Sequence, residues 1–187
     1  MICLSKSLIR LAYYPSLAYN RAMCALGIWN HWDLIDPMIL LGAVPSRADL
    51  RTLHGMGVRS IVNLCEEFAG HIEEMASLGM TQCHLPTLDY HCPPEDVLIR
   101  GVRFLGQETA AGRKTYVHCK AGQGRSATLV LCHLMASSEI SAMDAYAKLK
   151  SIRWHISRRL DRRAPVLAVE RRLRSGSLYV DKVGADR

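Results

Sequence analysis

His118-Cys119-Lys120-Ala121-Gly122-Gln123-Gly124-Arg125-Ser126 is the most informative segment of the chain, because a cysteine and an arginine flank five loop residues, two of them glycine. The residues before it, 114–117, predict a short strand, and residues 127–136 after it predict an apolar helix. A strand, a glycine loop and a helix in this order aim backbone amides at an anion. The stretch therefore predicts a phosphate-binding loop with a nucleophile at its base.

Strands and helices alternate along the rest of the chain. Apolar runs predict strands at 38–42, 57–64, 81–85 and 114–117. Helical patterns and capping residues predict helices at 49–55, 71–78, 93–110, 127–136, 142–151 and 160–173. This alternation is typical of an α/β sandwich.

Cys119 is the candidate nucleophile. Because a phosphate monoester is anionic, an enzyme has to neutralise it and supply a nucleophile that is already ionised. Amides of residues 120–125 and the following helix N-terminus lower a thiol pKa from its free value of about 8.5. The planar guanidinium of Arg125 can hold two phosphate oxygens, which a lysine cannot do. We expect a Cys119 thiolate with Arg125 as phosphate clamp; an inert buried cysteine is the alternative.

The other residues of the stretch support this chemistry. The predicted phosphate-binding loop consists of Lys120, Ala121, Gly122, Gln123, Gly124 and Arg125. Its two glycines let the backbone approach an oxyanion without a Cβ, and one or both are expected to hold a positive φ. His118 is expected to orient the loop and tune Cys119 rather than to transfer protons.

Asp89 is the candidate general acid, since the leaving oxygen of a phosphate ester needs a proton. It follows the strand at 81–85 and precedes the loop Tyr90-His91-Cys92-Pro93-Pro94, whose composition suits a segment that hangs over a neighbouring site. The same carboxylate would then act as base for the water that attacks the phosphocysteine. A turn or capping aspartate is the alternative. Asp96, the nearest rival, is typical of a first-turn helix acid.

Composition limits the cofactors and partners. The 187 residues carry a formal net charge of +7, which favours phosphate-bearing partners such as phospholipids, phosphoproteins or nucleic acid. No nucleic-acid-binding module is recognisable, so nucleic acid is not expected. The seven cysteines form no C-x-x-C pair and the eight histidines show no metal-ligand spacing, so reduced intracellular thiols and no metal or other cofactor are expected. Cys83, Cys92 and Cys132 are candidates for an oxidative disulfide with Cys119.

Three parts of the chain are predicted: an N-terminal segment 1–28, a catalytic domain 29–174 and a tail 175–187. Residues 1–28 contain basic but no acidic side chains, and Leu4, Leu8, Leu11 and Ala12 would share one helical face. Charge interrupts every apolar run before the roughly 18 to 20 residues of a membrane span, so no transmembrane helix is predicted. The segment is interpreted as an organelle presequence, an amphipathic membrane-surface helix, or an ordinary helix packed on the domain.

Residues 118–126 resemble the signature H-C-x-x-G-x-x-R-S/T of the dual-specificity group of the protein tyrosine phosphatase superfamily, and they match every fixed position. The resemblance implies an α/β fold with a central, mostly parallel sheet flanked by helices and the loop at the carboxyl end of a strand. It implies Asp89 as the general acid, because the family's acid precedes its cysteine at about the same spacing. It also implies that Ser126 helps the sulfur to leave when the intermediate is hydrolysed.

A closer resemblance, over residues 29–155, is to the mitochondrial phosphatidylglycerophosphate phosphatase and its homologues. It is carried by Ile35-Asp36-Pro37, Leu40-Leu41-Gly42-Ala43-Val44-Pro45, Glu66-Glu67-Phe68, Leu85-Pro86-Thr87-Leu88-Asp89 and His118-Cys119-Lys120-Ala121-Gly122. It implies hydrolysis of phosphatidylglycerophosphate in cardiolipin synthesis, at the mitochondrial inner-membrane surface in a eukaryote and in the cytoplasm or at a membrane otherwise. Two regions depart from that family: Gln123-Gly124, and residues 158–163.

Two further features concern the substrate. The loop also resembles that of the phosphoinositide 3-phosphatases through His118-Cys119-Lys120-Ala121-Gly122. That family carries a second lysine where this chain has Gln123, so the comparison disfavours a highly charged inositol phosphate as substrate. The C-terminal segment is rich in arginine, which predicts either a solvated face or, near the cleft, a site for anionic lipid heads. These arginines are Arg153, Arg158, Arg159, Arg162, Arg163, Arg171, Arg172 and Arg174.

The leading hypothesis is a phosphatase that acts on a phospholipid monoester through a phosphocysteine. A dual-specificity phosphatase acting on phosphoproteins is the second hypothesis, favoured if the cleft is shallow and lacks basic residues beyond the loop. A phosphate-binding pseudophosphatase is the third, and the presence of Cys119, Arg125 and Asp89 together argues against it.

Overall fold

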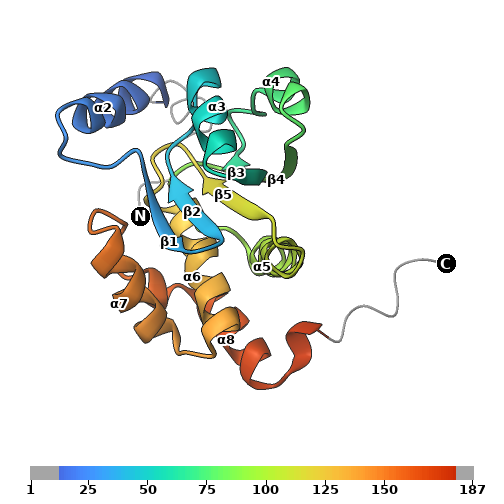
Figure 1. Cartoon of the computed structure of the whole chain (residues 1–187). Coiled ribbons are helices and arrows are strands. Elements are labelled where there is room, and N and C mark those ends of the chain that lie inside the picture. The colour runs from blue at the N-terminus through green and yellow to red at the C-terminus, as the bar shows by residue number, and fades with distance from the viewer. Residues whose placement is uncertain (1–12, 180–187) are drawn as a thin grey trace.

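A five-stranded sheet forms the centre of the protein in a computed structural model that describes residues 13–179 (Figure 1). The strands are β1 (Trp32–Asp36), β2 (Ile39–Gly42), β3 (Val58–Cys65), β4 (Thr81–Thr87) and β5 (Lys114–His118). Their order is β1-β2-β5-β3-β4; β1 is antiparallel to β2, and all other pairs are parallel. The predicted α/β fold with a mostly parallel sheet is confirmed.

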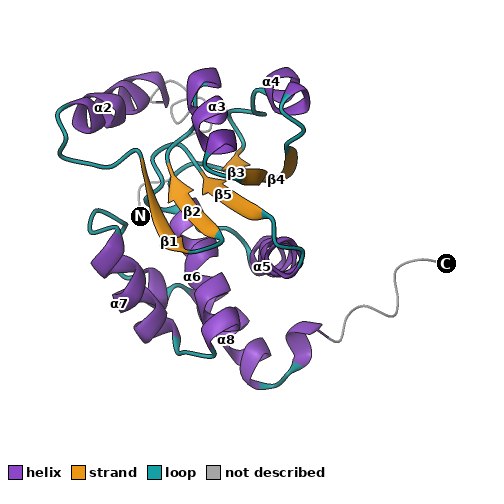
Figure 2. Cartoon of the chain, in the orientation of Figure 1, coloured by secondary structure: helices purple, strands orange, loops and turns teal. Residues whose placement is uncertain are grey.

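Helices cover both faces of the sheet (Figure 2). The α-helices are α2 (Tyr13–Ala25), α3 (Arg47–Gly55), α4 (Ile72–Ser77), α5 (Glu95–Ala110), α6 (Arg125–Ser138), α7 (Ala142–Ile152) and α8 (Ala164–Arg174), with short 3-10 helices η1 (Leu160–Arg162) and η2 (Ser177–Tyr179). α3 and α4 lie on one face, and α5 to α8 lie on the other (Figure 1). No helix among residues 13–179 is long and apolar enough to cross a membrane.

The inner strands are hydrophobic on both faces, because successive side chains of a strand point in opposite directions. One residue of each adjacent pair packs toward α3 and α4, and the next packs toward α5 and α6. The pairs are Leu40 and Leu41 in β2, Ile61 and Val62 in β3, and Tyr116 and Val117 in β5, all fully buried. This two-sided burial explains why the strands were recognisable as continuous apolar runs.

The parallel arrangement brings three chain segments to one edge of the sheet. β3, β4 and β5 all end there, and His118 at the end of β5 lies opposite Gly42 of β2 and Asn63 of β3. Polar residues that directly follow parallel strands meet at this carboxyl edge, where ligands of open α/β sheets bind. The fold therefore places the segments after β3, β4 and β5 around one site.

β1 was not predicted from the sequence. Its segment, Trp-Asp-Leu-Ile-Asp, has two carboxylates and is only partly buried, as suits an edge strand. Asp36 Oδ1 accepts hydrogen bonds from the amides of Met38 and Ile39 at 2.8 and 2.9 Å, which makes the tight turn into β2. A short edge strand of this kind carries too little apolar pattern to be recognised.

The single helix predicted over residues 160–173 is wrong at its start. The structure has η1 at Leu160–Arg162 and a separate α8 at Ala164–Arg174. Arg163 between them is extended, with φ −74° and ψ 135°, and Pro165 lies in the first turn of α8. Because proline lacks an amide hydrogen, it suits the first turn of a helix and interrupts one that runs through it.

Candidate active site

The Cys119 loop joins β5 to α6 and lies closely against β2. Cys119 follows β5 directly and is 3% exposed, and α6 begins at Arg125. Gly122 has a φ of +69°, and a Cβ on it would lie 2.5 Å from the backbone of Gly42. One of the two loop glycines thus has the predicted positive φ, and only a glycine fits at this position.

Arg153, just after α7, fixes the loop from behind. Its buried guanidinium donates from Nε to the Gly122 carbonyl at 2.9 Å and from Nη2 to the Ala121 carbonyl at 3.2 Å, while Nη1 pairs with Asp33 at 2.5 Å. The Ala121 carbonyl and the Gly122 amide belong to the same peptide group and point in opposite directions. Because Arg153 holds that carbonyl, the Gly122 amide faces the Cys119 sulfur and hydrogen bonds to it. Arg153 therefore orients a loop amide without touching the sulfur.

Cys119 lies in surroundings that favour its thiolate. Burial alone would raise the pKa of Cys119, but the Arg125 charge and hydrogen bonds from Ser126 and Gly122 outweigh it and lower the pKa below its ordinary value. The Ser126 hydroxyl donates to the sulfur at 3.2 Å. Cys119 is therefore a better nucleophile at neutral pH than an ordinary cysteine.

The Arg125 guanidinium is buried beneath the loop and is held from two neighbouring strand ends. Nη1 and Nη2 donate to the two carboxylate oxygens of Glu67 at 2.8 and 2.7 Å, and Nη1 also donates to the Thr87 carbonyl at 2.7 Å. Nε is buried and has no hydrogen-bond partner within residues 13–179. The side chain is thus fixed in orientation while one donor is left unused.

Asp89 reaches the loop from the end of β4. Its Oδ1 lies 2.9 Å from Arg125 Nη2, and its Oδ2 accepts a hydrogen bond from Lys120 Nζ. Tyr90 has a φ of +63°, an uncommon conformation for tyrosine, and its ring centroid lies 4.8 Å from Lys120 Nζ. The Asp89 carboxylate therefore lies against the cations Arg125 and Lys120. This part of the site stabilises negative charge.

His118 is buried behind the loop. Burial lowers the pKa of His118 to about 3, so the ring is neutral at neutral pH. The ring stacks on Tyr116 at a centroid distance of 5.8 Å, and Nδ1 lies 3.4 Å from the Cys119 carbonyl oxygen. A neutral, enclosed imidazole is suited to support the loop and not to exchange protons with a substrate.

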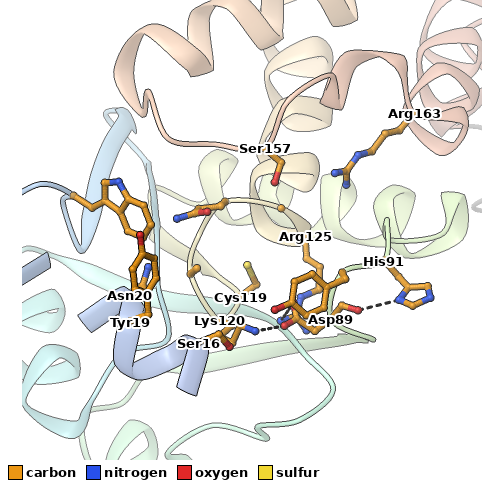
Figure 3. Close-up of a pocket in the computed structure, with 15 residues that line it drawn as sticks. Ser16, Tyr19, Asn20, Asp89, His91, Cys119, Lys120, Arg125, Ser157 and Arg163 are labelled. Atoms are coloured by element: carbon orange, nitrogen blue, oxygen red, sulfur yellow. Dashed lines mark hydrogen bonds and ion pairs between the residues drawn. The ribbon is translucent and has the colours of Figure 1, made fainter. Parts of the chain in front are cut away.

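A cavity of about 300 Å³ opens above Cys119 (Figure 3). The residues of the Cys119 loop that line this cavity, together with Asp89, are called its floor: Cys119, Lys120, Ala121, Gln123, Gly124, Arg125 and Asp89. We call its rim the residues Ser16, Tyr19, Asn20, Trp29, Tyr90, His91, Ser157 and Arg163. Tyr19 and Asn20 of α2 lie on one side of Cys119, and His91 and Arg163 lie on the other (Figure 3).

Comparison with known proteins shows the family of this chain. The family described as "Dual specificity phosphatase, catalytic domain" matches residues 39–172. The chain belongs to the dual-specificity phosphatase family. That family consists of phosphoric monoester hydrolases, and the residues that form the floor of the cavity lie within the matched region.

The names of two curated relatives describe enzymes that act on a phospholipid. Phosphatidylglycerophosphate phosphatase PTPMT2 of Arabidopsis thaliana is 37% identical over 148 residues, covering 77% of this chain and 65% of its own. Phosphatidylglycerophosphatase and protein-tyrosine phosphatase 1 of Homo sapiens is 34% identical over 163 residues, covering 82% and 81%. The chain therefore spans just under two thirds of the plant relative and most of the human one.

Solved structures of such phosphatases agree with the fold. The crystal structure of PTPMT1 in complex with PI(5)P has a TM-score of 0.73 and 29% identity, covering 79% of this chain and 99% of its own. The crystal structure of Tk-PTP in the active form, at 23% identity, has a TM-score of 0.70, covers 77% of this chain and 99% of its own, and supports the fold alone.

The structure gathers the residues predicted for the phosphatase site. Cys119, Arg125 and Asp89 line the floor, Ser126 contacts the sulfur, and the loop residues except Gly122 line the cavity. Gly122 lies within the loop against the backbone of Gly42, and His118 lies behind the loop. Among residues 13–179, no group of three or more His, Cys, Asp and Glu side chains could hold a metal ion.

Sequence reasoning missed three contributors to the site. Glu67 pairs with Arg125, and Arg153 was counted only among the C-terminal arginines. Residues of α2 line the rim, whereas the helical face predicted from Leu4, Leu8, Leu11 and Ala12 lies outside the described residues. Glu67 could have been found from its position just after the predicted strand at 57–64, where site residues of parallel sheets lie. Nothing in the sequence around Arg153 or α2 indicates that they contribute to the site.

The C-terminal arginines do not act as one patch. Arg153 is buried behind the loop and Arg163 lines the rim. Arg162, Arg172 and Arg174 pair with Asp161, Glu95 and Glu170. Cys83, Cys92 and Cys132 are free thiols, and burial raises the pKa of each, which makes them less reactive than Cys119.

Proposed function

We propose that Cys119 attacks the phosphorus of a monoester and forms a phosphocysteine. The sulfur–phosphorus bond forms as the bond from phosphorus to the leaving oxygen breaks, and protonated Asp89 gives its proton to that oxygen. Arg125 and the loop amides hold the phosphate oxygens and stabilise their transition-state charge. The unused Arg125 Nε is a donor for this purpose.

Hydrolysis of the phosphocysteine completes the cycle. The Asp89 carboxylate takes a proton from water as the water oxygen attacks phosphorus, and the sulfur leaves as a thiolate, stabilised by the Ser126 hydroxyl 3.2 Å away. Inorganic phosphate departs, and Asp89 is again protonated for the next cycle. For this cycle to begin, a bound phosphate displaces the Asp89 carboxylate from Arg125, where it lies in this structure.

The preferred substrate is phosphatidylglycerophosphate, which is converted to phosphatidylglycerol. The observation that carries this proposal is the rim, where aromatic side chains lie beside a phosphate site. Tyr19 and Tyr90 line the cavity and are 58% and 66% exposed, and exposed apolar groups that border a cleft suit an amphiphilic substrate. The names of the plant and human relatives support the same substrate.

A membrane location follows from this substrate. Trp154 is 59% exposed, and its ring contacts His155, which stacks on Trp29 of the rim. Ile28, beside Trp29, is 46% exposed. These side chains and the net charge of +7 suit peripheral contact with an anionic bilayer, at the mitochondrial inner membrane in a eukaryote. Residues 29–174 would then be the catalytic domain, 1–28 an N-terminal segment and 175–187 a tail.

A phosphoprotein phosphatase is the second candidate. The human relative is also named a protein-tyrosine phosphatase, and the matched family is that of the dual-specificity enzymes. A peptide substrate would present the same phosphate monoester to the same floor. The two candidates therefore differ in what the rim contacts.

The experiment that tests the proposal compares three substrates with the purified full chain. Turnover is measured on phosphatidylglycerophosphate in mixed micelles, on phosphatidylinositol phosphates in the same micelles, and on a phosphotyrosine peptide. We expect the highest kcat/KM for phosphatidylglycerophosphate. A large preference for the peptide would replace the lipid proposal with the protein-phosphatase one.

A further inference from the structure

Arg163 lies on the rim of the catalytic cavity, between η1 and α8. Its Nη1 donates to the Thr128 hydroxyl at 3.3 Å, and its guanidinium also hydrogen bonds to the Cys92 thiol. Both partners are neutral. No ion pair of 4 Å or less joins Arg163 to a carboxylate within the part of the chain that the structure describes, so a positive charge lines the cavity without a matching negative one.

The neighbouring arginines differ from Arg163 in this respect. Arg153 pairs with Asp33, Arg162 with Asp161, and Arg172 with Glu95, all through carboxylates of the protein. None of these three lines the cavity. Arg158, Arg159 and Arg171 also have no ion pair of 4 Å or less among residues 13–179, but they do not line the cavity. Arg163 is thus distinguished by the combination of a place on the rim and the lack of a carboxylate partner.

The charges of the floor leave Arg163 available to a ligand. Arg125 is matched by Glu67, and Lys120 by Asp89. A phosphate monoester that binds over Cys119 engages this group of charges and does not need Arg163. The guanidinium of Arg163 points toward the cavity from the side opposite Tyr19 and Asn20 (Figure 3). It is therefore placed to meet a second part of the same ligand.

We infer that Arg163 forms a second anion subsite, which binds a phosphodiester or similar anionic group carried by the phosphate-monoester substrate. The inference rests on the proposed function and deepens it, because phosphatidylglycerophosphate bears a phosphodiester one glycerol away from its monoester. A guanidinium can hold two oxygens of a phosphodiester with paired hydrogen bonds. The subsite selects for substrates that carry two anionic groups.

The test uses two soluble phosphate monoesters that differ in the second anion. One is glycerophosphoglycerophosphate, the deacylated head group, which has a monoester and a phosphodiester; the other is glycerol 3-phosphate, which has the monoester alone. We expect Arg163→Met to lower kcat/KM for the first about 10- to 100-fold, as loss of a charge-assisted contact does, and to change the second less than about twofold. Arg163→Lys restores part of the loss because it keeps the charge.

The matched control is Arg162→Met, which removes the same charge one residue away from a side chain that is 75% exposed and outside the cavity. It leaves both substrates within about twofold. Thermal unfolding of each variant shows whether the fold is kept. Equal losses on the two substrates with Arg163→Met, or no loss on either, would overturn the subsite.

The outcomes separate the subsite from the proposed function. If Arg163→Met lowered kcat/KM for glycerophosphoglycerophosphate but the parent protein did not turn over micellar phosphatidylglycerophosphate, the subsite would be supported and the lipid proposal refuted. Turnover of the micellar lipid that is unchanged by Arg163→Met would support the lipid proposal and refute the subsite.

Discussion

The floor and the rim of the cavity are built in opposite ways. On the floor, the charged groups are matched before any substrate binds: Arg125 by Glu67 and Lys120 by Asp89, with Arg153 and Asp33 fixing the loop from behind. On the rim, aromatic side chains are exposed and Arg163 lacks a carboxylate among residues 13–179. The floor is therefore organised in advance for one chemistry, whereas the proposed substrate would supply the missing partners of the rim.

Cys119→Ser is the substitution with the largest expected effect, because it removes the nucleophile from the floor. We expect kcat for 4-nitrophenyl phosphate to fall by roughly 10⁴-fold or more, with an unchanged circular dichroism spectrum. Cys132→Ser, in a cysteine that the mechanism does not use, is the control. Activity within tenfold of the parent protein would show that the floor works without a thiolate.

Asp89→Ala has the next largest expected effect, and the size of that effect should depend on the leaving group of the substrate. The loss in kcat/KM for an alkyl phosphate should be about 10²- to 10⁴-fold, the usual contribution of a general acid. An aryl phosphate should lose less, because its leaving oxygen needs less protonation. Asp96→Ala, on the exposed first turn of α5, is the matched control. Equal losses on both esters would move the general acid to another residue.

Arg153→Met tests whether the floor depends on its buried support. The substitution removes the cation from the Asp33 carboxylate, which is only 10% exposed and keeps one hydrogen bond, from Asn30 Nδ2 at 2.6 Å. Loss of the charge partner costs about 3–5 kcal/mol of unfolding free energy. Urea unfolding with an unchanged m-value measures this loss, and the exposed Arg162→Met should stay within about 0.5 kcal/mol of the parent. A loss below about 1 kcal/mol would mean that the loop is held by other contacts.

Ser126→Ala tests the electrostatics of the floor through pH. The Ser126 hydrogen bond favours the thiolate, so its removal raises the pKa of Cys119. The acid limb of the kcat/KM profile and of iodoacetamide alkylation should both move to higher pH, with the largest deficit on the acidic side. Ser138→Ala, an exposed serine on the same helix, should leave both curves unchanged. A shift toward lower pH would contradict the assigned role.

Tyr19→Ala should have the smallest effect, because it changes only a side chain of the rim. We expect kcat/KM for micellar phosphatidylglycerophosphate to fall a few-fold, because an exposed aromatic contact with the lipid is lost, and that for 4-nitrophenyl phosphate to stay the same. Met143→Ala, which removes a 68% exposed apolar side chain of α7 outside the cavity, is a control for loss of an exposed hydrophobic group. If both substrates lost activity equally, α2 would serve to support the floor.

The floor could be predicted from the sequence because most of it is contiguous. The loop residues lie together, and Asp89 lies two residues after β4, a strand that was recognisable in the sequence over residues 81–85. Its supports could not be predicted, since Arg153 reaches Gly122 from 31 residues further along and Asp33 comes from the unrecognised β1. The register of distant segments decides those contacts.

The rim was beyond sequence reasoning for the same physical reason. Tyr19 comes from α2, Tyr90 from the segment after β4, and Arg163 from the break between η1 and α8. In the sequence Arg163 is one of eight C-terminal arginines, and only its packing separates it from Arg162. The sequence therefore predicted the reaction better than the substrate.

Isolation of the phosphocysteine tests the proposed mechanism most directly. An aryl phosphate transfers its phosphoryl group readily without an acid, whereas hydrolysis of the intermediate needs the Asp89 base, so Asp89→Ala should accumulate it. The variant is mixed with 4-nitrophenyl phosphate and quenched, and its peptides are analysed by mass spectrometry. We predict a phosphoryl group on Cys119, absent when Cys119→Ser is added. A phosphoryl group on another residue, or none during turnover, would contradict the mechanism.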